Sequence, residues 1–140
     1  MTDLEQADRS VVILADDLIW ATRLSDAITA AGARPRAARR LADLERLMAP
    51  GLEVGPRADA GEVASTQGPG FAIVDLTARA YDGIEAIRLA TGTGARVVAV
   101  GQHDDRDQRR AAIAAGAERV FTYRALFEDG PRILAAWLAR

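Results

Sequence analysis

Short apolar runs rich in β-branched residues alternate along this chain with segments whose apolar residues recur at helical spacing. The first run, VVILA at Val11 to Ala15, is typical of a strand that is covered on both faces. From Leu18 to Ala31 the apolar residues follow a helical period, and Gly32 is a typical helix end. The other predicted strands are Arg34 to Ala38, Phe71 to Val74, Arg96 to Val100 and Arg119 to Tyr123, and the other predicted helices are 41–48, 84–90, 107–115 and one around 133–138.

This alternation predicts an α/β fold, with a parallel sheet and helices on both of its faces. Right-handed crossovers leave few topologies for five strands, and we expect the flavodoxin-like order 2-1-3-4-5. A chain of 140 residues is a single domain by its length. Residues 51–70 are rich in glycine, proline and small residues, so we expect a long flexible insertion loop there, with at most a helical turn at Glu62 to Ser65.

Two residue types are missing, and their absence excludes whole classes of chemistry. The chain has no cysteine, which excludes disulfides, zinc–thiolate sites and thiol catalysis. All 18 basic residues are arginine, so a Schiff-base or phosphate-loop lysine is excluded as well. The net charge of -2 gives no overall attraction to nucleic acid or membranes. The polar start is unlike a signal peptide and no apolar run could span a bilayer, so we expect a cytoplasmic protein.

Acidic residues follow two strands that the predicted order makes neighbours. Asp16 and Asp17 come after the first strand, and Asp75 ends the third. Open α/β sheets place their sites at the carboxyl ends of such strands. Carboxylates gathered there can hold Mg²⁺, and one beside the metal can act as a nucleophile toward phosphorus. The alternative is structural, with Asp16 or Asp17 capping the helix that follows.

The stretches VVILADD, AIVDL, YDG and AAGAERVF follow one another with Gly83 eight residues after Asp75. In this order they resemble the receiver domain of response regulators, the CheY-like family, from Val11 to Leu138. VVILADD is similar to the family's first strand and acidic cluster, and AIVDL to the strand that ends in its phosphorylated aspartate. The resemblance implies that Asp75 is the phosphoacceptor equivalent, with Asp16, Asp17 and Asp75 as the metal ligands where Mg²⁺ binding is retained.

Several positions depart from that family. The degenerate positions are Ala15, Gly101, Tyr123 and Arg124, which stand in place of an acid, a hydroxyl residue, a lysine and a proline. The resemblance implies that the lysine and the hydroxyl stabilise the phosphoryl group, through charge-assisted bonds worth roughly 1.5–3 kcal/mol each. We therefore expect a pseudo-receiver, in which a phosphorylated Asp75 would have little to act on.

Other motifs have simpler explanations. ATGTGA at 90–95 precedes a strand, so it is a helix end and a turn rather than a phosphate loop. His103 is the only histidine, and exposed loop histidines are commoner than metal ligands. Two arginine strips, Arg34/Arg36/Arg39/Arg40 and Arg106/Arg109/Arg110, are each suited to an acidic partner or nucleic acid, while charge on an edge strand also discourages edge pairing.

The function we expect is that of an atypical receiver-like domain, without enzymatic activity, that binds another protein. The chain ends at the fifth helix, so action in trans is expected. The contact face implied by the resemblance is the fourth helix, fifth strand and fifth helix, with Arg109, Arg110, Tyr123 and Arg124 as its candidates. A homodimer through that face is a further expectation. The alternatives are an active single-domain response regulator phosphorylated on Asp75 with Mg²⁺, and a small-ligand-binding regulatory module.

Overall fold

A computed structural model of the chain describes residues 9–49 and 69–140. In chain order the elements are β1 (Ser10–Leu14), α2 (Leu18–Ala30), β2 (Arg34–Ala38), α3 (Leu41–Met48), β3 (Phe71–Asp75), α4 (Gly83–Gly92), β4 (Arg96–Gly101), α5 (Arg106–Ala115), β5 (Val120–Thr122) and α6 (Tyr123–Leu138). All five strands are parallel, in the order β2-β1-β3-β4-β5. The predicted fold class and strand order are confirmed.

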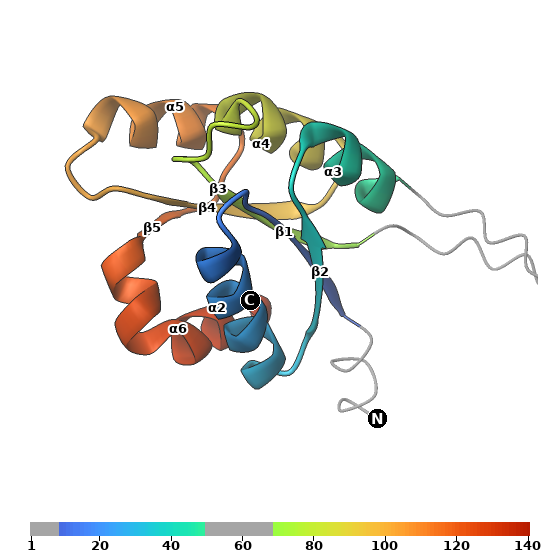
Figure 1. Ribbon diagram of the computed structural model, residues 1–140, viewed down its shortest axis with the longest axis vertical. Helices are drawn as coiled ribbons and strands as arrows, with labels where there is room; N and C mark the ends of the chain where they lie inside the picture. The colour runs from blue at the N-terminus through green and yellow to red at the C-terminus, as the bar shows by residue number, and fades with distance from the viewer. Residues whose placement is uncertain (1–8, 50–68) are drawn as a thin grey trace, which may run out of the picture.

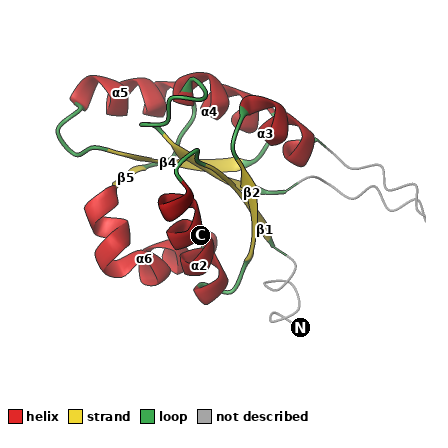
Figure 2. Cartoon of the chain, in the orientation of Figure 1, coloured by secondary structure: helices red, strands yellow, loops and turns green. Residues whose placement is uncertain are grey.

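The sheet lies between two helical layers, with α3, α4 and α5 on one face and α2 and α6 on the other (Figures 1 and 2). Successive side chains of a strand point to opposite faces, so β1 contributes to both layers. Val12 and Leu14 pack in one hydrophobic cluster with α3, α4 and α5. Val11 and Ile13 pack in the other, with α2 and α6. This burial on both faces explains why the strands are continuous apolar runs.

The sequence prediction was wrong at the start of the last helix. Tyr123 was predicted to end the fifth strand, but β5 ends at Thr122 and α6 begins at Tyr123. The Thr122 hydroxyl accepts a hydrogen bond from the Ala125 N–H at 3.0 Å, which caps the new helix directly after the strand. The backbone of α6 is non-helical at Asp129, two residues before Pro131. That break divides the helix and conceals its first half from a periodicity analysis.

The other boundaries lie within two residues of the predicted ones, and those of β2 and α3 match the prediction. β3 extends one residue beyond the predicted range Phe71 to Val74, to Asp75. The predicted insertion loop at 51–70, with its helical turn at Glu62 to Ser65, lies outside the described residues except for its last two, so the domain assignment stays a prediction. Within 9–49 and 69–140, no helix has the length and apolarity needed to cross a membrane.

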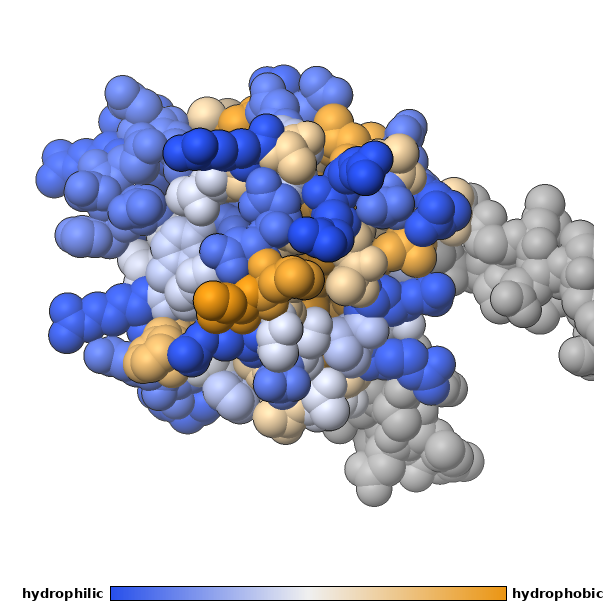
Figure 3. Space-filling view, viewed as in Figure 1, coloured by the Kyte–Doolittle hydropathy of each residue, from blue (hydrophilic) through white to orange (hydrophobic). Residues whose placement is uncertain are grey.

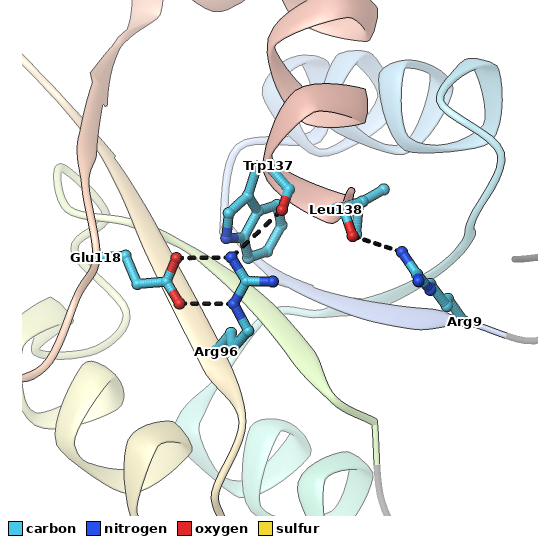
Figure 4. A network of polar contacts seen from close by, with 5 residues as sticks. All are labelled: Arg9, Arg96, Glu118, Trp137 and Leu138. Atoms are coloured by element: carbon cyan, nitrogen blue, oxygen red, sulfur yellow. Dashed lines mark hydrogen bonds and ion pairs between the residues drawn. The ribbon is translucent and has the colours of Figure 1, made fainter. Parts of the chain in front are cut away.

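A polar network joins the amino-terminal end of the sheet to the end of α6 (Figure 4). The Arg96 guanidinium donates to both carboxylate oxygens of Glu118, at 2.7 and 3.0 Å, and to the Trp137 carbonyl at 3.3 Å. Arg9 donates to the Leu138 carbonyl. The hydrogen bond from Arg96 holds the pKa of Glu118 below its ordinary value. The network therefore satisfies carbonyls at the carboxyl end of α6, where a helix leaves them free.

We expect Glu118→Gln to lower the free energy of unfolding by up to about 1 kcal/mol near neutral pH, because the pair is partly exposed and screened by solvent. The folded-state pKa of Glu118 is depressed, so this contribution is present at neutral pH and lost as the pH falls through that pKa. Urea unfolding of the wild type and of Glu118→Gln from about pH 7 to about pH 2 measures this contribution, and the two free energies of unfolding should converge in acid. The control is Glu128→Gln, whose more exposed pair with Arg124 should contribute less. A loss that is equal at every pH would contradict the assignment.

Candidate functional site

Asp75 is a buried carboxylate at the carboxyl end of the central strand, with 2% of its surface exposed. Its Oδ1 atom accepts hydrogen bonds from the Thr77 N–H and the Thr77 hydroxyl, both at 3.0 Å. The same oxygen accepts a third hydrogen bond, from the Tyr123 hydroxyl. A buried carboxylate is costly without such donors. These three hydrogen bonds therefore offset part of the cost of burying Asp75.

Tyr123 reaches Asp75 from the first turn of α6. Its hydroxyl also contacts the Thr77 hydroxyl, so three side-chain groups meet at one point. The Tyr123 ring packs against Trp20 of α2, with the ring centroids 4.7 Å apart. Burial, and then the hydrogen bond to Asp75, raise the pKa of Tyr123 above that of a free phenol. Tyr123 is therefore neutral at physiological pH and donates its proton.

Asp16 and Asp17 have different structural roles. The Asp16 Oδ2 atom accepts from the backbone N–H groups of Arg79 and Ala80, at 2.9 and 3.1 Å. Asp17 is the N-cap of α2, and its Oδ1 accepts from the N–H groups of Ile19 and Trp20. The capping alternative thus describes Asp17, whereas Asp16 fixes the loop that follows β3.

Tyr81 is a site residue that the sequence analysis missed. Its buried hydroxyl lies 2.7 Å from the Asp75 carbonyl and 2.9 Å from the Leu14 carbonyl, so it links the ends of β3 and β1. Burial, followed by the charge of Asp75, raises the pKa of Tyr81. The sequence feature that could have identified Tyr81 is the YDG stretch, in which it precedes Asp82 and Gly83. A Cβ atom at its glycine, Gly83, would lie 2.9 Å from a Leu76 side-chain carbon, so only glycine fits without a shift.

The carboxylates share one open pocket of about 480 Å³. Its lining residues are Asp16, Asp17, Trp20, Asp75, Thr77, Arg79, Gln102 and Tyr123. Arg79 is the one cation among them, and the sequence analysis did not select it. No group of three or more acidic or histidine side chains in the described part of the chain is arranged to hold a metal ion. The Mg²⁺ expected where metal binding is retained stays a prediction, and no chemical step is assigned to it.

The other predicted positions lie around neighbouring pockets. Gly101, His103, Tyr123 and Arg124 line one of about 340 Å³, and Arg124 pairs with Glu128 at 3.2 Å. Arg109 and Arg110 line another of about 660 Å³. His103 lines both pockets, so the residues of the predicted partner face are divided between two neighbouring pockets that share this histidine. Ala15 is buried in the cluster beneath α2 and α6.

Gln108 of α5 was also missed. Its side-chain amide donates to the carbonyl of Leu76, the residue after Asp75, at 3.1 Å. A Cβ atom at Gly101 would lie 3.5 Å from the Gln108 Oε1 atom and 3.2 Å from a Leu76 side-chain carbon. A side chain at residue 101 would therefore make an ordinary contact with Gln108 and would require Leu76 to shift by a few tenths of an ångström.

We expect neither tyrosine of the chain to ionise near pH 10 in the folded protein, because the pKa values of Tyr81 and Tyr123 are both raised. The folded state holds these two protons more tightly than the unfolded state does. The contribution of the two phenols to the free energy of unfolding is therefore fully present below about pH 10 and falls as the pH rises further. Tyrosinate absorbance should therefore appear together with the loss of helical circular dichroism. Tyr123→Phe should weaken this alkaline dependence while lowering stability at neutral pH by about 1–3 kcal/mol, because Asp75 loses a donor. A phenol that titrates near pH 10 in the native protein would contradict this geometry.

No protein-family model matches the chain, and no curated protein matches it. Solved structures do. The BeF3-activated DrrB receiver domain has 16% sequence identity and a TM-score of 0.71, with 95% of this chain and 99% of that chain covered. The phosphorylated cyanobacterial phytochrome response regulator RcpA has 17% identity and a TM-score of 0.69, with 94% and 95% covered. A response regulator receiver domain from Rhodospirillum rubrum has 20% identity and a TM-score of 0.67, with 93% of each chain covered. The chain therefore has the CheY-like fold of response-regulator receiver domains.

Proposed function

We propose that this chain is an atypical receiver-like signalling domain that acts in trans by binding another protein, independently of aspartyl phosphorylation. The observation that carries the proposal is the hydrogen bond from the Tyr123 hydroxyl to Asp75. The resemblance to receivers implies a lysine ammonium at this position. Here a neutral phenol occupies it and already bonds to the carboxylate.

The charge balance of the pocket supports the same proposal. A phosphoryl group on Asp75 would replace the single charge of the carboxylate with roughly two negative charges beside Asp16 and Asp17. Of the residues that line the pocket, only Arg79 could offset them. Arg124 is exposed and paired with Glu128 outside this pocket. Phosphorylation would thus be poorly compensated, because like charges in a partly buried site repel one another.

The chain lacks the hydroxyl that would respond to a phosphoryl group, as well as the lysine ammonium that would offset its charge. Gly101 has no hydroxyl that could move toward Asp75, and the Leu76 side chain lies close beside it. We therefore propose that the surface of α5, β5 and α6 is presented constitutively. The candidate contacts are Arg109, Arg110, Tyr123 and Arg124, and a homodimer through the same face belongs to the proposal as its self-binding form. A non-catalytic role in the cytoplasm completes it.

Intact-mass analysis after incubation with Mg²⁺ and acetyl phosphate is the test. We expect no added phosphoryl group on the wild-type chain, because Tyr123 holds Asp75 and no lysine can offset the new charge. An ordinary receiver in the same tube shows that the conditions are sufficient, and Asp75→Asn identifies any adduct at this residue. An adduct on the wild type that Asp75→Asn removes would establish the active-regulator alternative instead.

A second candidate function is that of a small-ligand-binding module. The observation in its favour is the open pocket of about 480 Å³ in which Arg79, Gln102 and three carboxylates gather polar groups near Asp75. Sites with a few convergent polar groups are suited to small polar molecules. This alternative is less specific than the first, because Asp16 and Asp17 already accept backbone hydrogen bonds.

A further inference from the structure

Three arginines and one isoleucine form an outward-facing stripe on α5. Arg106, Arg109, Arg110 and Ile113 are spaced at i, i+3, i+4 and i+7, which places them on one side of a helix. The opposite side is anchored in the protein, because Ala112 is fully buried between α5 and the sheet. The stripe therefore has no role in packing the core.

The three arginines of this stripe have no ion-pair partner within the described residues. The ion pairs found there use Arg46, Arg96, Arg124 and Arg132 instead. Acidic residues are close in sequence, at Asp104, Asp105 and Asp107, yet none of them pairs with the stripe. Asp105 instead accepts a hydrogen bond from the Gln108 N–H at 3.0 Å and caps α5.

A hollow of about 660 Å³ follows the stripe. It is lined by His103, Arg106, Arg109, Arg110, Ile113 and Ala114, and by no carboxylate. Ile113 is 46% exposed, so an apolar side chain contributes to the surface of this hollow. An apolar contact point among guanidinium groups suits a ligand that is both apolar and anionic.

The stripe is also rigidly presented. Gln108, on the inner side of α5, bonds to the Leu76 carbonyl at 3.1 Å, and Asp105 caps the helix. Binding to such a surface loses little backbone entropy, because the helix is already in place.

We propose that the stripe binds an acidic segment of a partner protein, in which carboxylates pair with the arginines and one large apolar side chain packs on Ile113. The inference rests on the proposed function, and it specifies the chemistry of the partner. It also separates the two parts of the predicted face, because Tyr123 and Arg124 line a different pocket.

A protein segment fits this surface better than nucleic acid does. No phenylalanine, tyrosine or tryptophan lines the hollow, so the large rings on which single-stranded bases usually stack are not part of it. The chain has a net charge of -2, which gives no wider basic field for a phosphate backbone. The exposed surface over α5 is hydrophilic, whereas an apolar patch lies over the start of α2, where Leu18 and Ile19 are exposed (Figure 3). Nothing in the structure indicates what covers that second patch.

The test is selection of a phage-displayed library of random peptides on the immobilised wild-type chain, followed by fluorescence anisotropy with one enriched, labelled peptide. We expect enrichment of acidic peptides that carry one large apolar residue. The double variant Arg106→Glu/Arg110→Glu should weaken binding of the peptide by about tenfold or more, because it replaces attraction by repulsion. Ile113→Ser should weaken binding by about threefold or more through lost apolar contact.

The matched control is Arg34→Glu/Arg36→Glu, which makes the same change in net charge on the exposed edge strand β2 and should leave binding unchanged. Circular dichroism of each variant verifies folding. Absence of enrichment, enrichment of peptides without acidic residues, or equal binding by the Arg106→Glu/Arg110→Glu variant would overturn the proposal.

Two other occupants are outcomes of the same experiment. A labelled single-stranded oligonucleotide that binds more tightly than the peptide, and requires the same arginines, would replace the proposal with nucleic-acid binding. A dimer in sedimentation velocity that Arg106→Glu/Arg110→Glu dissociates would replace it with self-association. Peptide binding by the Asp75→Asn variant cannot depend on phosphorylation at residue 75. This variant therefore tests the arginine stripe even if the wild-type chain proves to be phosphorylated.

Discussion

The burial of one carboxylate constrains the organisation of this site more than any other feature. Asp75 ends the central strand with almost no exposed surface, and a carboxylate in that position must be hydrogen-bonded or neutralised. A lysine could do this in a related fold, but the chain has none. Thr77 and Tyr123 supply neutral donors instead, and Tyr123 can do so because α6 begins directly after β5.

Neutral donors and a cation have different consequences for chemistry at the same carboxylate. A cation gains interaction energy as negative charge accumulates, so it favours a phosphorylated state. The pKa of the Tyr123 phenol is raised by burial and by its hydrogen bond to Asp75, so the phenol stays neutral. A neutral donor stabilises the unmodified carboxylate, and it gains little interaction energy when the negative charge at Asp75 increases. A neutral donor in place of a cation thus favours the unmodified carboxylate over the phosphorylated one. Under the proposed function, the surface of α5, β5 and α6 can then remain in one arrangement.

The sequence was sufficient for the fold because its strands are continuous apolar runs, a pattern that buried parallel strands require. It also located Asp75, since strand order brings the ends of β1 and β3 together. It did not reveal that the Tyr123 phenol bonds to Asp75, because that contact depends on the exact residue at which α6 begins. Nor did it reveal Tyr81, whose hydroxyl bonds to the Leu14 carbonyl in β1, and Gln108, whose amide bonds to the Leu76 carbonyl just after β3. Such contacts are set by tertiary packing, and neither composition nor periodicity records them.

The glycine at 101 links the site to the surface of α5. A side chain there would approach Leu76 to 3.2 Å, so Leu76 would have to move by a few tenths of an ångström. Gln108 bonds to the Leu76 carbonyl beside this glycine and holds the start of α5 against the sheet. The position that would carry a responsive hydroxyl in the resembling family thus adjoins the contact that holds the helix bearing Arg106, Arg109 and Arg110. Under the proposed function, the missing hydroxyl at residue 101 and the fixed arginine stripe are neighbouring features of one site.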